Sequence, residues 1–149
     1  MTRSQNARFM GAAPGDEEFD HPPGAGLARA LSAALAEGGW EVEELENWRD
    51  SGWSVRCRRG AADVEVVVAA TGEPHAWFLQ IAPYDAPGAL ARLFGKKQAS
   101  ADAEHLLAVS RLAHATLESR GFRDLRWKWN GYPDAAQSTP VPAALDEPR

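Results

Sequence analysis

Two stretches of the chain repeat their apolar residues at the spacing of an amphipathic helix. In Gly24–Glu37, leucines recur every four residues along one face, at Leu27, Leu31 and Leu35. A longer stretch, Ser100–Arg120, carries one continuous apolar stripe made of Leu106, Val109, Ala113 and Leu117. An apolar stripe on a helix must be buried against another element. Both predicted helices therefore require an apolar surface beneath them.

Elsewhere the apolar residues alternate with polar ones at a period of two, which is typical of strands with one buried face. The alternating segments are Trp40–Leu45, Trp53–Arg58, Asp63–Ala69, His75–Pro83 and Phe122–Asn130. The first four follow one another through short connections, which favours an antiparallel meander. We therefore predict an α+β fold of order αββββαβ. The predicted architecture is a two-layer sandwich, with a mostly antiparallel five-stranded sheet and two helices on one face.

The two ends of the chain differ in composition from this predicted domain. Residues 1–22 show no apolar period, and residues 132–149 are rich in proline. Neither end carries enough apolar surface to offset the entropy lost on ordering it. We therefore expect flexible tails at 1–22 and 132–149, around a single α+β domain that spans residues 23–131.

The chain carries a formal net charge of −5, and its charges are unevenly distributed. Glu37–Asp50 holds six acids and one base, whereas arginines and lysines cluster later in the chain. Because an acidic surface repels phosphates, nucleic acid is not an expected partner. No apolar run approaches the ~20 residues that span a bilayer, so no stable membrane insertion is expected. A single cysteine and the absence of a signal-peptide pattern favour a cytoplasmic protein.

No combination of residues in the sequence predicts catalysis, a cofactor or a metal centre. His114 and Glu118 are four residues apart on the second predicted helix, but two ligands make only half a metal site. Cys57 alternates with Arg56 and Arg58, so both arginines are predicted to face away from the thiol. This arrangement predicts a buried, unreactive cysteine. We assign no catalytic residue and expect no cofactor and no bound metal.

The six tryptophans are the most unusual feature of the composition. Those in predicted strands would fill the space between helices and sheet; they are Trp40, Trp53, Trp77, Trp127 and Trp129. Trp48 lies instead in a polar loop, and beside Arg49 it is a candidate contact for a partner protein. A ring that folds back over the edge of the core is an equally good interpretation of Trp48.

The segment Ala89–Lys97 is the second candidate interaction surface. It has a short apolar stripe surrounded by cations, formed by Leu90, Arg92, Leu93, Phe94, Lys96 and Lys97. One interpretation is a contact with an acidic protein surface or an anionic membrane. The other is a connector that packs its apolar side chains on the domain.

The segments GWEVEEL, WSVRCR, VEVVVA, WFLQIAP, LARLFGKK and GFRDLRWKW together resemble a group of small uncharacterised bacterial α+β domains. That resemblance covers about Gly24–Asn130 and implies no known activity. The predicted architecture is also similar to that of the type III secretion chaperones, which are small, acidic α+β proteins. The similarity implies a protein that dimerises and binds extended segments of its clients. Those chaperones place three strands before the second helix and two after it, whereas four and one are predicted here.

We expect a non-catalytic protein-interaction domain, either a chaperone-like or an immunity-type binder, whose partner is another protein or a second copy of the chain. The acidic balance and the absence of catalytic motifs favour this class. The alternative is a small enzyme or ligand-binding protein with a pocket between the sheet and the helices. A pocket with converging polar groups would favour the alternative, and an exposed binding surface would favour the interaction domain.

Overall fold

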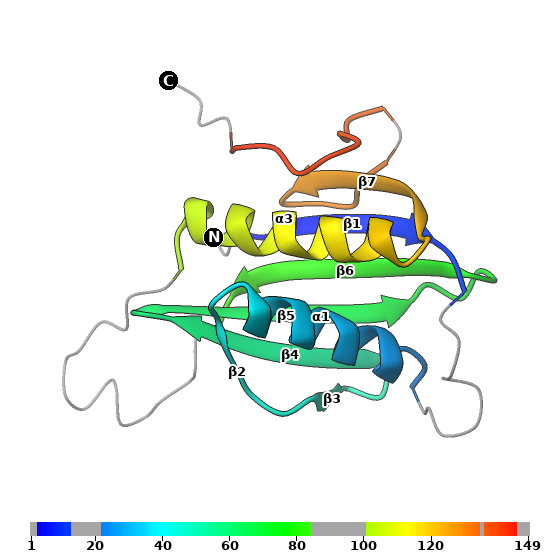
Figure 1. Ribbon diagram of the computed structural model, residues 1–149. Helices are drawn as coiled ribbons and strands as arrows, with labels where there is room; N and C mark the ends of the chain where they lie inside the picture. Colours follow the sequence, from blue (N-terminus) through cyan, green and yellow to red (C-terminus); the bar gives the residue numbers. More distant parts are fainter. Residues whose placement is uncertain (1–2, 13–21, 85–100, 135, 146–149) are drawn as a thin grey trace.

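The computed structural model describes residues 3–12, 22–84, 101–134 and 136–145 of the chain. Within them, two helices lie on one face of an antiparallel sheet, as Figure 1 shows. The predicted α+β fold with two layers is thus confirmed, although the sheet has seven strands in place of five. No helix within the described ranges is long and apolar enough to cross a membrane.

The two helices are α1 (Ala25–Glu37) and α3 (Ala103–Ser119). Their buried faces are the predicted stripes, with Leu106 and Leu117 each 0% exposed. The side chain of Asp102 accepts a hydrogen bond from the backbone N–H of His105 and so caps the first turn of α3. α1 ends at Glu37 with Gly38 as its C-cap, and the next residue, Gly39, has φ +93°, a conformation that favours glycine.

The strands are β1 (Gln5–Met10), β2 (Glu41–Val42), β3 (Glu46–Trp48), β4 (Gly52–Arg59), β5 (Ala62–Ala70), β6 (Ala76–Pro83) and β7 (Arg123–Trp129). Their order across the sheet is β2-β4-β5-β6-β1-β7, with β3 also paired to β4. β2, β4, β5 and β6 form the predicted antiparallel meander.

The predicted tail over residues 1–22 is wrong for residues 5–10. These residues form β1, an interior strand that pairs with β6 on one side and with β7 on the other. Ala7 and Phe9 face the helices, and both are fully buried. β1 therefore belongs to the core of the domain.

The predicted tail over residues 132–149 is wrong for the part that the structure describes. Residues 131–134 and 136–145, which we call the arm, run along β7 (orange to red in Figure 1). The backbone groups of Thr139 and Trp127 exchange two hydrogen bonds, of 2.8 and 2.9 Å. Pro133 and Pro142 are buried. The arm is thus a packed part of the fold.

The core lies between the helices and the facing side of the sheet. Trp40, Trp77 and Trp127 are buried there, which confirms their predicted role, while Trp53 and Trp129 are partly buried at its margin. Cys57 is also in the core and is 1% exposed.

The open face of the sheet as candidate functional site

Every second side chain of the sheet points away from the helices, onto a surface that we call the open face because no described helix covers it. The cross-strand register aligns these positions in rows. One row consists of Trp48, Gly52, Ala69, Phe78, Arg8 and Arg126. Gly52 is required in this row, since a Cβ there would lie 2.3 Å from the carbonyl oxygen of Val68.

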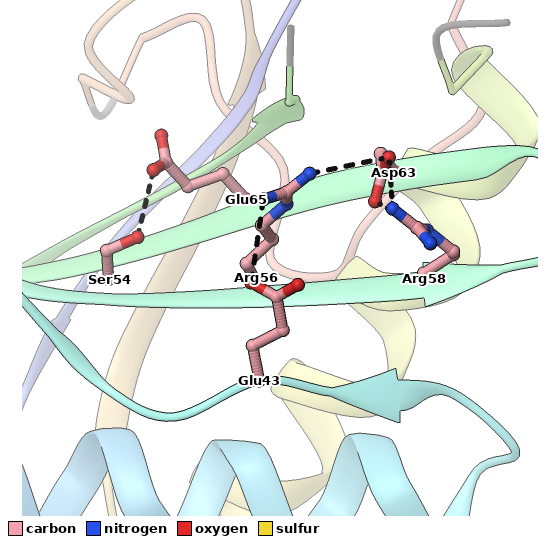
Figure 2. A network of polar contacts seen from close by, with 6 residues as sticks. All are labelled: Glu43, Ser54, Arg56, Arg58, Asp63 and Glu65. Atoms are coloured by element: carbon pink, nitrogen blue, oxygen red, sulfur yellow. Dashed lines mark hydrogen bonds and ion pairs between the residues drawn. The ribbon is translucent and has the colours of Figure 1, made fainter. Parts of the chain in front are cut away.

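A network of ion pairs occupies the open face over β4 and β5 (Figure 2). Its centre is Arg56, whose terminal nitrogens lie 3.5 Å from Glu43 and 3.7 Å from Asp63. The guanidinium also stacks 3.7 Å above the ring of Tyr84. These contacts hold Arg56 on three sides, so its position is fixed by the fold.

Two further pairs extend this network along the same strands. Arg58 donates hydrogen bonds of 3.2 and 3.3 Å to the two oxygens of Asp63, and this hydrogen bonding raises the pKa of Arg58. Ser54 donates a 2.9 Å hydrogen bond to Glu65. Both arginines of this half of the face are therefore paired with carboxylates.

Cys57 lies on the opposite side of β4 from Arg56 and Arg58, as the alternation predicts. Burial, with a smaller contribution from the charge of Asp63, raises the pKa of its thiol to about 12. A thiol that stays protonated at neutral pH is a poor nucleophile.

The arm lies on the other half of the open face, over β1 and β7. Side chains of these strands donate hydrogen bonds to carbonyl oxygens of the arm. Asn6 Nδ2 lies 2.8 Å from the oxygen of Gly131, and Arg8 Nε lies 2.7 Å from that of Pro133. Arg126 Nη2 lies 2.6 Å from the carbonyl oxygen of Ser138.

Beyond Thr139 the arm passes around the edge of β7 to the side of the helices. There the carbonyl oxygen of Ala143 accepts a 2.8 Å hydrogen bond from Trp129 Nε1 and a 3.4 Å hydrogen bond from Gln5 Nε2. The sheet thus holds the arm mainly through carbonyl oxygens, which every residue type possesses.

Three cations on this half of the face have no carboxylate partner among the described residues. They are Arg8, Arg126 and Lys128, which contact backbone carbonyls, the Ser138 hydroxyl and the Gln137 side chain. Their positive charge is therefore not compensated locally by a described acid. This distinguishes the β1–β7 half of the open face from the paired half over β4 and β5.

Two small cavities are lined by described residues. One, of about 290 Å³, lies at the end of β1 and β6 and is lined by Arg8, Phe9, Met10, Thr71, Glu73, Ala76, Trp77 and Tyr132. The other, of about 170 Å³, lies beside the ion-pair network. Neither of the two is lined by a residue of α1 or α3.

His114 and Glu118, weighed above as half a metal site, take part in a different arrangement. His114 Nδ1 accepts a 3.0 Å hydrogen bond from Trp127 Nε1, and its Nε2 lies 2.7 Å from a carboxylate oxygen of Glu118. Because both ring nitrogens have partners inside the protein, this histidine serves to anchor Trp127. No three potential metal-ligating side chains cluster within the described ranges.

Of the residues predicted to form an interaction surface, the structure describes one and leaves the others outside its described ranges. Trp48 ends β3 rather than lying in a loop, and its register places it on the open face, with Arg49 5.2 Å from its ring. Leu90, Arg92, Leu93, Phe94, Lys96 and Lys97 lie outside the described residues. The prediction for that surface therefore stays a prediction.

Sequence reasoning missed Asn6, Arg8 and the arm, because the residues that meet there are separated by most of the chain. Arg126 and Lys128 alternate with Trp127 and Trp129 in the predicted strand Phe122–Asn130, and in the structure the two cations lie on the face opposite the two tryptophans. Comparison with protein-family models, curated proteins and solved structures finds no match to this chain.

Proposed function

We propose that this protein is a non-catalytic interaction domain that binds an extended segment of a partner protein on the open face of its sheet. The observation that carries this proposal is the way the arm is held. On the open face, three side chains of β1 and β7 donate hydrogen bonds to its carbonyl oxygens, namely Asn6, Arg8 and Arg126. Gln5 and Trp129 donate to a further carbonyl oxygen of the arm, that of Ala143, on the side of the helices. A surface that binds main-chain carbonyls can accept segments of varied sequence.

The chemistry of the described residues supports a binding role over a catalytic one. The protonated Cys57 and the paired Arg56 and Arg58 offer neither an activated nucleophile nor a free electrophile. Neither of the two cavities lined by described residues has a lining residue from α1 or α3, so neither supports the alternative of a pocket between sheet and helices.

The proposal is tested by selecting peptides from a displayed random library against the full-length chain. Amide chemical shifts then map where a selected peptide binds. We expect the shifts to follow the open-face positions of β4, β5, β6, β1 and β7. Trp48→Ala and Gln80→Ala, both on the open face, should each weaken binding at least tenfold.

The matched control is Arg111→Ala, which changes an exposed residue on α3, on the opposite side of the molecule. It should leave the affinity unchanged. Circular dichroism must show that all variants are folded. A selection that yields no ligand, or a ligand that maps to α1 and α3, would refute the proposal.

A further inference from the structure

The arm is attached to the sheet mainly by side-chain contacts and not by a continuous backbone ladder. A single backbone bridge, between Trp127 and Thr139, joins it to β7, and its other polar contacts involve side chains. Its two exposed large apolar residues, Tyr132 and Val141, are 58% and 53% exposed. Segments with few buried apolar contacts open at low free-energy cost. Because the arm shares only one backbone bridge with the sheet, we expect it to open at a lower free-energy cost than the interior strands.

The sheet beneath the arm has a clear electrostatic preference. Arg8, Arg126 and Lys128 are not paired with any described acid, so a segment that carries carboxylates would gain attraction there. In composition alone, the chain's own residues 131–149 are acidic on balance. They contain three acids (Asp134, Asp146 and Glu147) and one base (Arg149).

The arm also indicates which backbone conformation the surface over β1 and β7 accepts. Two prolines of the arm, Pro133 and Pro142, are buried against the sheet, while the carbonyls near them accept hydrogen bonds. Proline fixes its own φ and disfavours a helical conformation in the residue before it, so less entropy is lost when such a segment is ordered in an extended form.

We infer that the surface over β1 and β7 binds an acidic, extended, proline-containing segment of a partner protein, and that the arm occupies this surface until the partner replaces it. This inference rests on the proposed function and specifies its ligand. Because the arm is tethered next to its site, its effective concentration is ~mM. A partner segment must therefore bind more tightly than the arm, or reach the surface when the arm is released.

The test uses the full chain with two sets of substitutions. In the released variant, Thr139→Pro removes the N–H that donates to Trp127, and Pro142→Ser weakens the second buried anchor. The locked variant carries Lys128→Cys and Ser138→Cys. These two residues lie opposite each other, one position along the antiparallel register from the Trp127–Thr139 bridge. Positions paired in this way are close enough for a disulfide. The oxidised and reduced forms of this variant both lack Lys128, so reduction of the disulfide provides the matched control in the same sample.

The probe is a fluorescent synthetic peptide with the sequence of residues 131–149, and its anisotropy reports binding. We expect the released variant to bind the probe at least tenfold more tightly than the unmodified chain, and the oxidised locked variant to show no binding. Added salt should weaken the binding. In the released background, Arg8→Gln with Arg126→Gln should lose at least tenfold in affinity, whereas Arg111→Gln should have no effect.

Three results would overturn the inference. The first is that the locked and released variants bind the probe with equal affinity. The second is that a probe whose three acids are replaced by lysine binds as tightly as the original probe. The third is that the released variant forms a stable dimer in light scattering. A dimer would mean that the arm of a second copy is the occupant. If the probe fails to bind but library peptides still map to β4–β6, the proposed function stands and only this assignment of the ligand fails.

Discussion

Replacing Phe9 with alanine tests whether the first strand of the chain is part of the core. Phe9 is 1% exposed, and its ring meets that of Phe122 edge-on, with the centroids 5.3 Å apart. Truncation of a fully buried phenylalanine to alanine costs about 3–5 kcal/mol. An aromatic pair of this geometry adds to the loss, which places the expected value in the upper half of that range. Domains of this size have total stabilities of about 5–15 kcal/mol, so the effect is large.

The matched control is Phe78→Ala, because Phe78 occupies a neighbouring register position on the open face. Its ring is partly exposed and stacks on Tyr132, with centroids 5.9 Å apart. The smaller buried area predicts a loss of about 1–2 kcal/mol. The same chemical change is therefore made on both faces of the sheet.

Both variants are measured by urea unfolding, followed by circular dichroism and tryptophan fluorescence. An unchanged slope with a lower midpoint indicates lost stability without a change in the surface exposed on unfolding. If Phe9→Ala costs less than ~1 kcal/mol, or no more than Phe78→Ala, β1 is not an interior strand and the reasoning is refuted.

Three further predictions concern single residues. Because burial raises the pKa of Cys57 from 9.0 to about 12, native protein at pH 8 should react slowly with a thiol reagent. The stability contributed by this group should be constant below pH 9 and fall between pH 9 and about 12, a decline that Cys57→Ala should lack in alkaline unfolding curves. Trp127→Phe leaves His114 Nδ1 without its donor and should cost about 1–3 kcal/mol in denaturant unfolding, and a loss below ~0.5 kcal/mol would contradict the assigned hydrogen bond. Gly52→Ala places a methyl group against the carbonyl of Val68, so the midpoint of thermal unfolding should fall, and an unchanged midpoint would mean that the strands separate freely there.

Alternation in the sequence predicts strands well where each face has one kind of residue. Trp53–Arg58 and His75–Pro83 have large apolar residues on one face, and both lie in strands of the sheet. In β1 the core-facing positions are Gln5, Ala7 and Phe9. Because one of these residues is polar and another is small, the sequence of β1 shows no apolar alternation that would predict a buried face. Gln5 is buried because its amide reaches the arm, a contact that no local pattern reveals.

The candidate site was less predictable than the fold for a related reason. Its donors on β1 come from a segment without apolar period, and its acceptors are backbone carbonyls, which leave no signature in residue types. Trp48 was placed in a loop because the polar residues around it interrupt the alternation. In the structure its backbone pairs with Gly52 at the edge of β4, where polar neighbours are expected of an edge strand.

The position of β1 between β6 and β7 has a consequence for the biosynthesis of the protein. Gln5 pairs with Ile81 on one side and with Trp129 on the other, so β1 is made before both of the strands with which it pairs. At roughly 5–20 residues per second, β1 waits several seconds for β6 and longer for β7. Closure of such long loops is slow. Newly made chains therefore hold Phe9 and the unpaired edges of β1 exposed until synthesis passes β7, and during that interval a general chaperone has its best opportunity to bind them.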